Sequence, residues 1–327
     1  MLTFLVSVGH EYTVDRLLMP DVRESGLEVS VLAYESAFVQ TSLPRATYFF
    51  TDFERMYPWE LRLAARLYMV LRAAGCKVLN NPARALAKYQ LLRTLHRVGI
   101  NRFTTYRADD LPMPSRFPVF VRMEGDHAAM IHDLIPDAET LVKVLARLVA
   151  GGIPLRGLLI TEYCGEPIAP GLFRRFATFR IGDRFVPEGM VLQKIWAVKH
   201  GFSDPENAKY HPMELEFVKE NRYLDTVRRA FELAHLEYGR ADIGVVEGQP
   251  QIYEINSSPN LKEVDFEKIP ESRQEAIRLS WGMRLEAFNA LDVHRGETGT
   301  VEIEDDFLAR HRRMRTRPDG IGPAIRP

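Results

Sequence analysis

The first 80 residues alternate between short apolar runs and stretches of helical length. Residues 2–8 (LTFLVSV) and 27–34 (LEVSVLAY) are apolar and rich in residues that favour strands. Between Arg62 and Ala74, apolar side chains recur at helical spacing, and Gly75 follows as a stop signal. The pattern predicts a small α/β domain over residues 1–80.

A further helix is predicted over residues 81–98. This segment opens with an Asn-Pro pair, which is typical of an N-cap followed by proline at the first helical position, and Gly99 follows its end. Leu91 and Leu92 belong to its buried stripe, and Lys88 lies three and four residues before them, beside that stripe. A lysine in this position can reach into a cleft.

The rest of the chain alternates between strand and helix patterns. The polar segment 200–212 interrupts them and is long enough to form a mobile active-site loop. The Gly-Asp pair at 182–183 indicates a hairpin turn. Strands are predicted over 119–122, 158–163, 176–179, 185–187, 241–246 and 251–255, and helices over 138–149, 224–236 and 272–290.

Composition narrows the class of protein. The chain has 327 residues, of which 46% are hydrophobic, and it carries 43 basic against 44 acidic residues. This balance is typical of a soluble globular protein with two or three subdomains. Because the net charge is near zero, nothing draws the whole molecule to nucleic acid or anionic lipid, and we expect neither as a partner.

Cysteine usage and hydropathy predict a cytoplasmic protein. Cys76 and Cys164 show no CxxC spacing, so neither a disulfide framework nor a structural zinc site is indicated. The apolar start lacks a basic flank and is short, which favours a buried strand over a signal peptide. No apolar run reaches the roughly 18 residues of a membrane span.

Residues 291–327 are polar, and we expect them to form a flexible tail. An anion-docking arm is the alternative, because arginine is concentrated there. These arginines are Arg310, Arg312, Arg313, Arg315 and Arg317.

The strands predicted over 241–246 and 251–255 carry an ordered set of polar residues. If the two strands pair through their turn, Asp242 and Glu254 lie side by side. Asn256 is two residues beyond Glu254 and points to the same face, and Arg240 shares the face of Asp242. Carboxylate and amide oxygens suit Mg²⁺, and an arginine beside them can contact phosphate.

The alternative is that these residues are ordinary charges at strand ends. On that interpretation Asn256 only begins a turn with the Ser-Ser-Pro sequence that follows. It accounts for any one residue as well as a metal site does. It predicts neither the shared face nor the arginine, so the ordered set favours the metal site.

Residues 80–262 resemble the ATP-grasp superfamily, which includes the D-alanine ligases, the ribosomal-protein glutamate ligases and glutathione synthetase. The family signature is an acidic residue on one strand, then Glu-x-Asn and a nearby proline, which match Asp242, Glu254, Asn256 and Pro259. The resemblance implies that the first three bind one or two Mg²⁺ ions, for which Mn²⁺ can substitute, bridging the ATP phosphates. Arg240 matches an arginine of the D-alanine ligases, which implies a catalytic role.

The resemblance extends upstream to the residues that bind ATP. Lys88 matches the first ATP lysine of the family. Arg122 stands where a second lysine normally follows a strand, and guanidinium can grip phosphate, although the two side chains are not interchangeable. The glycine-rich phosphate loop of the family is replaced by the segment 124–127 (EGDH), which contains a single glycine.

The segment 159–164 (LITEYC) resembles the hinge strand whose backbone meets the adenine edge in this family. This implies that Glu162, Tyr163 and Cys164 contact ATP, although an apolar strand ending in polar residues is also simply a strand. Arg180 and Lys199 are further candidates for contacts with the triphosphate or a substrate carboxylate.

The resemblance implies an α+β protein with the ATP-grasp fold. It divides the chain into an N-terminal α/β domain (1–80) of the Rossmann-like, pre-ATP-grasp type, subdomain A (81–156), subdomain B with the metal site (157–290), and the tail (291–327). A nucleotide cleft is expected between the two ATP-grasp subdomains.

The function implied is that of an Mg-ATP-dependent, ADP-forming carboxylate–amine ligase with an acyl-phosphate intermediate. The expected partners are a small acid, amino acid or peptide that supplies the carboxylate, and an amine acceptor. A kinase of the same fold that phosphorylates a hydroxyl, and a nucleotide-binding module without catalysis, are the alternatives. No motif identifies the substrate or the oligomeric state.

Overall fold

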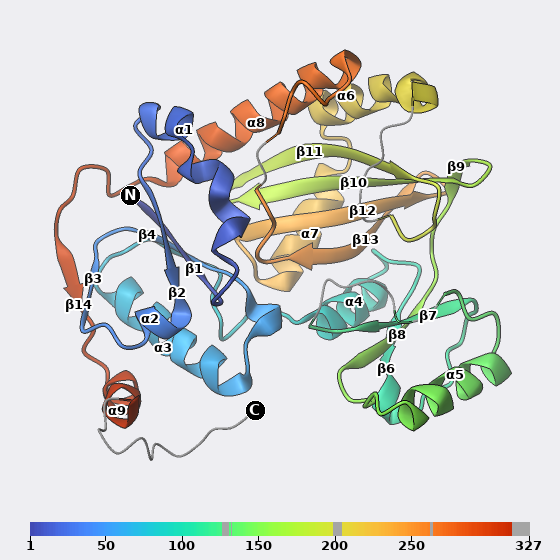
Figure 1. The fold of residues 1–327 in the computed structure, drawn as a ribbon, viewed down its shortest axis with the longest axis horizontal. Helices are drawn as coiled ribbons and strands as arrows, with labels where there is room; N and C mark the ends of the chain where they lie inside the picture. The colour runs from blue at the N-terminus through green and yellow to red at the C-terminus, as the bar shows by residue number, and fades with distance from the viewer. Residues whose placement is uncertain (126–130, 132, 199–204, 262–263, 316–327) are drawn as a thin grey trace.

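The structure is a computed structural model that describes residues 1–125, 131, 133–198, 205–261 and 264–315 (Figure 1). Helices and sheets both contribute, and the α+β class predicted from the sequence is confirmed. Among the described helices, none combines the length and the apolar character that crossing a membrane requires.

The N-terminal unit is built on a parallel sheet with the strand order β2-β1-β4-β5. Every residue of β1 is buried, because a parallel sheet covered on both faces needs a continuous apolar strand. The strands are β1 (Leu2–Val6), β2 (Val29–Ala33), β4 (Thr47–Phe50) and β5 (Val78–Leu79), and the helices are η1 (Glu11–Leu18), α1 (Pro20–Glu24), α2 (Tyr34–Ala37), η2 (Phe53–Arg55) and α3 (Pro58–Ala73).

The middle of the chain forms a three-stranded antiparallel sheet, β6-β8-β7, against which α5 packs. Leu141 and Val144 of α5 are buried with Val121 and Ile160 of the sheet. The elements of this part are α4 (Lys88–Arg97), β6 (Thr105–Arg107), η3 (Ala108–Asp110), β7 (Val119–Met123), α5 (Ala138–Ala150) and β8 (Leu158–Glu162).

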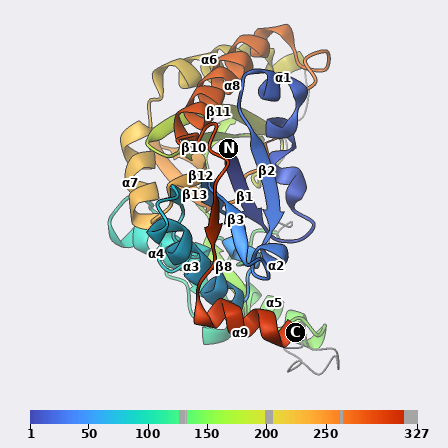
Figure 2. The same ribbon diagram turned by 90° about the vertical axis from the view of Figure 1, so that its left-hand side faces the viewer.

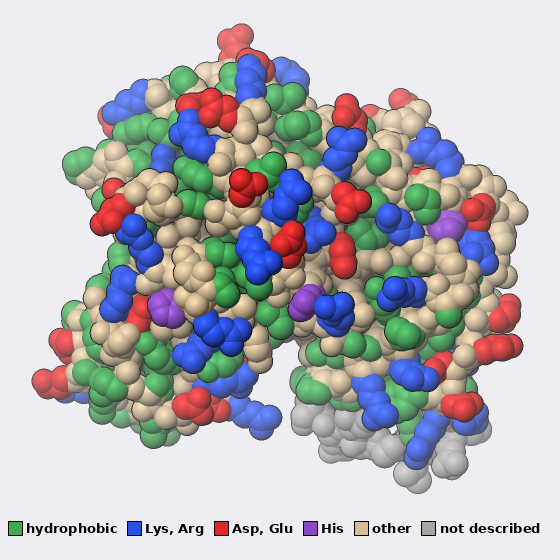
Figure 3. All heavy atoms as spheres, turned by 180° about the vertical axis from the view of Figure 1, so that it is seen from behind, with side chains coloured by type: hydrophobic (Ala, Val, Ile, Leu, Met, Phe, Trp, Pro, Cys, Tyr) green, Lys and Arg blue, Asp and Glu red, His purple; other side chains and the backbone are tan. Residues whose placement is uncertain are grey.

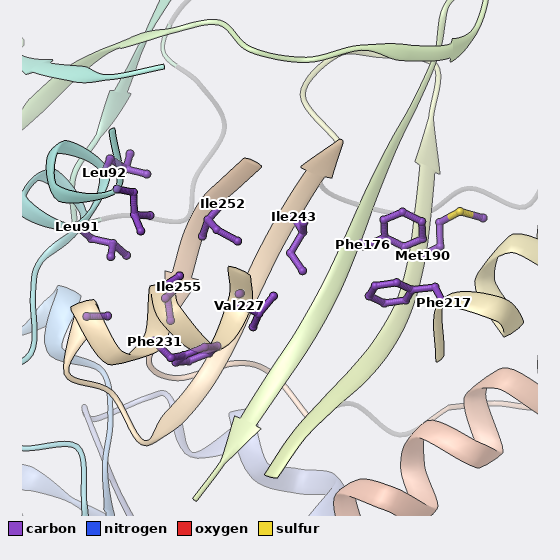
Figure 4. Close-up of a cluster of buried hydrophobic side chains, with 14 of the residues drawn as sticks. Leu91, Leu92, Phe176, Met190, Phe217, Val227, Phe231, Ile243, Ile252 and Ile255 are labelled. Atoms are coloured by element: carbon purple, nitrogen blue, oxygen red, sulfur yellow. The ribbon is translucent and has the colours of Figure 1, made fainter. Parts of the chain in front are cut away.

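The largest sheet is antiparallel, with the order β11-β10-β12-β13 and with β9 paired to β10. Its core joins it to α4 and α7, since Leu91 and Leu92 lie with Phe231, Ile252 and Ile255 (Figure 4). The elements are β9 (Pro167–Ala169), β10 (Leu172–Ile181), β11 (Arg184–Gln193), η4 (Pro205–Tyr210), α6 (His211–Glu220), α7 (Leu224–Ala234), β12 (Tyr238–Val246), β13 (Gln249–Asn256) and α8 (Glu271–Leu291).

Asn80 links the parallel sheet to this antiparallel sheet. Its side chain is fully buried, and its φ of 63° lies in the left-handed region that asparagine tolerates. Its Nδ2 donates to the carbonyls of Phe50 (3.0 Å) and Tyr238 (2.9 Å), and its Oδ1 accepts the N–H groups of Glu237 and Tyr238. The N-terminal unit is thereby fixed to the beginning of β12.

The predicted helix over 81–98 is wrong at its start, because α4 begins only at Lys88. The Asn-Pro pair instead opens a turn, in which Asn81 Oδ1 accepts the N–H of Ala83. The N–H of Leu86 donates to the carbonyl of Ala234 at the end of α7, so the segment before Lys88 is held by α7. Lys88 consequently stands at the first helical position.

The predicted irregular loop over 200–212 is wrong for its second half, where η4 occupies 205–210 and α6 begins at His211. Its first half, to residue 204, lies outside the described residues.

The expected flexible tail is also wrong for residues 300–315. There β14 (Thr300–Glu302) pairs with β3 (Ser42–Pro44), and α9 (Asp306–Arg315) packs against α3 (Figure 2). Leu308 is fully buried, and the guanidinium of Arg62 lies over the ring of Phe307. The apolar positions of α9 therefore complete the N-terminal core, and residues 316–327 lie outside the described part.

Candidate functional site

The strands β12 and β13 bring the predicted metal ligands together. Asp242 is the cross-strand partner of Glu254, as the sequence pattern predicted, and Arg240 is the partner of Asn256. The register shifts immediately after Asp242, and such an irregularity is common beside active sites, where it re-aims a side chain. Two carboxylates and one amide are therefore presented at neighbouring positions of one strand pair.

Glu254 is the meeting point of three elements. Its Oε2 accepts a hydrogen bond from Arg122 Nη2 of β7 at 2.6 Å and lies 3.3 Å from Lys88 Nζ of α4. The side chain of Lys88 is only 5% exposed. Burial lowers the pKa of Lys88, and the charge of Glu254 acts in the opposite direction. Two cations thus converge on one carboxylate at the edge of the sheet.

Asp242 is contacted by two arginines, Arg175 of β10 and Arg240 of β12. Arg175 Nη1 donates to Oδ2, and Arg240 Nε lies 3.3 Å from Oδ1. Burial raises the pKa of the Asp242 carboxyl, whereas the two arginines lower it. For Arg240, burial lowers the pKa, but the neighbouring carboxylates outweigh burial and raise it above its usual value.

The chain of charges continues away from Asp242. Arg240 Nη1 lies 3.4 Å from Glu188 Oε2 on β11, and Arg284 Nη1 of α8 lies 3.6 Å from Glu188 Oε1. The guanidinium of Arg284 also lies over the rings of Phe179 and Trp281. A partly buried row of alternating charges therefore extends from the predicted metal site to α8.

The donor set fits Mg²⁺. Oδ1 of Asp242 is buried and accepts no hydrogen bond from the described residues, although Arg240 Nε is near it. Asn256 Oδ1 accepts the N–H of Ser258 at 2.8 Å. In the described residues, no group of three or more His, Cys, Asp or Glu side chains is placed to hold a metal. Mg²⁺ takes few protein oxygens when phosphate and water supply the rest, so two carboxylates and an amide are sufficient.

A cavity opens on one side of the carboxylates, between β7–β8 and the antiparallel sheet. It reaches Asp242 and Glu254 at one end, and Arg122, Tyr163 and Cys164 line it. Aromatic side chains form much of its wall, as a planar base requires. These are Phe103, Phe120, Tyr163, Phe173, Trp196 and Tyr253.

The predicted adenine segment lies in this wall, with part of its backbone already engaged. The N–H groups of Glu162 and Tyr163 donate to the carbonyls of Thr104 and Pro118. The carboxylate of Glu162 is buried and accepts hydrogen bonds from Tyr106 Oη, Ser115 Oγ and the Thr104 N–H. The side chain of Glu162 therefore holds the strand end in place, and its contact with adenine stays a prediction.

A second cavity lies on the other side of the carboxylates. It is enclosed by β11, α8 and the N-terminal unit, and it contains Arg240 and Asn256. The two cavities share Arg175, Asp242 and Glu254. The carboxylate pair thus stands where two separate binding spaces meet.

No protein-family model and no curated protein matches the chain by sequence. Solved structures do match. The ATP-grasp ligase PsnB complexed with a minimal precursor has a TM-score of 0.51 at 13% identity, over 88% of this chain and 98% of that chain. PsnB complexed with a phosphomimetic precursor variant, Mg and ADP has a TM-score of 0.50 at 14% identity, over 86% and 97%. The chain has the ATP-grasp fold.

A more distant match is D-alanine–D-alanine ligase from Bacillus anthracis complexed with ATP. Its TM-score is 0.46 at 11% identity, over 89% of this chain and 99% of that chain.

Within the ATP-grasp fold, Arg180 lies away from the cleft. Its Nε and Nη1 donate to the carbonyls of Gly182 and Leu236, and it lines a separate cavity with Arg84 and His235. Successive strand residues point to opposite faces of a sheet. Arg180 lies five residues after Arg175, so the two side chains point to opposite faces of β10. The predicted ATP contact of Arg180 does not agree with this placement.

Two other predicted nucleotide contacts lie wholly or partly outside the described residues. Lys199 is one. The glycine-poor phosphate loop over 124–127 is described only as far as Gly125, where Glu124 Oε1 accepts the N–H of Tyr89.

The charged row contains residues that the sequence did not identify as part of the site. Arg175 stands in a part of the chain, residues 174–199, that contains several basic residues, and no local pattern marks Glu188 or Arg284. Their positions depend on the pairing of β10 with both β11 and β12 and on the packing of α8 against β11. The alternation of side chains along β10 is the one signal that favours Arg175 over Arg180.

Proposed function

We propose that this protein is an Mg-ATP-dependent, ADP-forming carboxylate–amine ligase that acts through an acyl phosphate. The observation that carries the proposal is the meeting of two cavities at Asp242 and Glu254. One cavity has the aromatic wall that a nucleotide needs. The other contains many charged side chains, among them Arg240 and Arg55, and the N-terminal unit forms part of its wall. ATP in the first and a carboxylate in the second would meet at the carboxylate pair.

The residues divide between these tasks. Lys88 and Arg122 would bind phosphate oxygens, while Asp242, Glu254 and Asn256 would hold Mg²⁺. When bound, Mg²⁺ neutralises phosphate charge and orients the transferring group. Arg240, beside Asp242 in the second cavity, would bind the substrate carboxylate and stabilise charge on the transferring phosphoryl group.

The chemistry needs no nucleophile from the protein. A carboxylate oxygen attacks the γ-phosphorus, the bond to the β,γ-bridging oxygen breaks, and ADP leaves with the electron pair. An amine nitrogen then attacks the acyl carbon, the bond from that carbon to the phosphate oxygen breaks, and the amine loses a proton. The chain supplies positions and cations, which account for most of the catalysis in such transfers.

Among the described residues, the face seen in Figure 3 shows no large area of a single charge that would attract a polyanionic partner. Acidic and basic side chains are interspersed over the face seen in Figure 3, as expected for a chain with a formal net charge of −1. The PsnB structures contain precursor peptides, so peptides belong with amino acids and small acids among the candidates.

A screen of carboxylates and amines with Mg-ATP tests this function. We expect one pair to release ADP and inorganic phosphate together, with turnover dependent on both partners. A phosphorylated hydroxyl product without free phosphate would identify a kinase instead. Tight ATP binding with no consumption by any pair would identify a module without catalysis.

A further inference from the structure

The short helix η2 of the N-terminal unit reaches into the second cavity. Arg55, its last residue, lines this cavity together with Asp242, Glu254 and Asn256, and it is not part of the first cavity. Nothing in the family signature involves this residue. Its position places a guanidinium from the N-terminal unit on the substrate side of the carboxylate pair.

The guanidinium of Arg55 is held by the buried carboxylate of Asp52. Arg55 Nη1 donates to Asp52 Oδ1 at 2.7 Å. Asp52 is fully buried, and its Oδ2 also accepts the N–H of Ser7 at 3.0 Å and lies 3.2 Å from His10 Nδ1. A guanidinium has five N–H donors, so this bond leaves others to face a ligand.

The partner of Arg55 differs from the partners of the other arginines in this cavity. In the described lining, Arg175, Arg240, Arg273 and Arg284 each contact a carboxylate that itself lines the cavity. Asp52 does not line it. The carboxylate that balances the charge of Arg55 therefore lies outside the cavity. The part of the guanidinium that lines the cavity is suited to binding an anion.

The backbone around Arg55 is built to keep it in place. Asp52 has φ 62° and ψ 24°, a left-handed conformation that strains a residue with a Cβ. Such strain persists where the surrounding structure enforces it. Here Glu54 accepts hydrogen bonds from Ser257 N at 3.0 Å and Ser257 Oγ at 2.8 Å, immediately after Asn256. The helix η2 is thus attached to the end of β13, the strand that carries Glu254 and Asn256.

We propose that Arg55 binds the carboxylate-bearing substrate, and that Asp52 and His10 are positioning residues for it. The inference rests on the proposed ligase function and adds a specific substrate contact from the N-terminal unit. A carboxylate matches the planar fork of a guanidinium, which accounts for arginine at this position.

Arg55→Ala and Arg122→Ala are expected to have opposite effects on the two substrates, because the two arginines line different cavities. With the carboxylate that drives the fastest ADP release in the screen, Arg55→Ala is expected to raise its apparent KM about 10- to 100-fold, the worth of a charge-assisted hydrogen bond. ATP affinity, measured by calorimetry, stays unchanged. Arg122→Ala shows the reverse pattern, with weaker ATP binding and an unchanged carboxylate KM.

Two conservative variants separate substrate binding from a structural role. Arg55→Lys keeps the charge without the fork, so its KM should lie between those of the wild type and Arg55→Ala. Asp52→Asn tolerates the left-handed conformation but loses the charge that holds Arg55, so the same KM rises with ATP affinity retained. A structural role would instead lower the melting temperature and weaken both ligands together.

The outcomes distinguish this inference from the function on which it rests. An unchanged carboxylate KM in Arg55→Ala, with an active wild type, overturns the inference alone. If none of the carboxylates in the screen makes the wild type release ADP, the proposed function is overturned, and the inference with it.

Discussion

Replacing Glu254 by glutamine is expected to abolish turnover while leaving the fold intact. The substitution keeps the shape of the side chain but removes one of the two charges proposed to hold Mg²⁺. Removing a single group that stabilises developing charge in a transition state costs on the order of 10²–10³-fold in rate, and a metal-bound charge should cost at least as much. The pairing of β12 with β13 does not depend on this charge, so the fold should be retained. The melting temperature should fall, because Lys88 and Arg122 lose their shared carboxylate.

Calorimetry gives Glu254→Gln a second, sharper signature. In the absence of Mg²⁺, Lys88 and Arg122 lose their shared carboxylate and should bind ATP at least as well as in the wild type. Added Mg²⁺ should no longer strengthen binding. Glu275→Gln, on the exposed face of α8, is the matched control and should behave as the wild type does. Normal Mg-ATP turnover by Glu254→Gln would refute the metal assignment.

Lys88→Ala and Arg122→Ala are each expected to weaken ATP binding by about 10- to 100-fold, because each removes a charged hydrogen-bond donor from partly or fully buried surroundings. In the structure both side chains contact Glu254. With Mg²⁺ bound to that carboxylate, they would be available to bind phosphate oxygens instead. The loss should be seen as a higher Kd in calorimetry.

The control for these two variants is Lys143→Ala, whose side chain is exposed on α5 and pairs with Glu139. It should leave ATP affinity unchanged. Unchanged affinity in both Lys88→Ala and Arg122→Ala would show that neither cation faces the nucleotide.

Local patterns were sufficient to predict the carboxylate pair. Asp242 and Glu254 are close in sequence, and the two-residue repeat of a strand determines which side chains share a face. The strand β1 is likewise readable, because burial on both faces of a parallel sheet leaves a continuous apolar pattern, and α3 is readable from its helical spacing of apolar residues.

Long-range packing could not be read from the sequence. Arg55, Glu188 and Arg284 reach the site from elements far apart in the chain, and no local pattern marks the pairing that brings them there. The tail was misjudged for a related reason. Its helix α9 is polar on average, yet Leu308 packs, with Val301 and Ile303, into a core whose remaining buried members lie between residues 5 and 76.

The most direct test of the proposed acyl phosphate traces an oxygen atom of the substrate carboxyl group. When the carboxylate substrate found in the screen carries ¹⁸O in its carboxyl group, transfer through an acyl phosphate leaves one ¹⁸O in the inorganic phosphate released upon amide formation. Mass spectrometry of that phosphate is predicted to show the label, dependent on Mg²⁺ and absent in Glu254→Gln. Unlabelled phosphate from the wild type during amide formation would contradict the account.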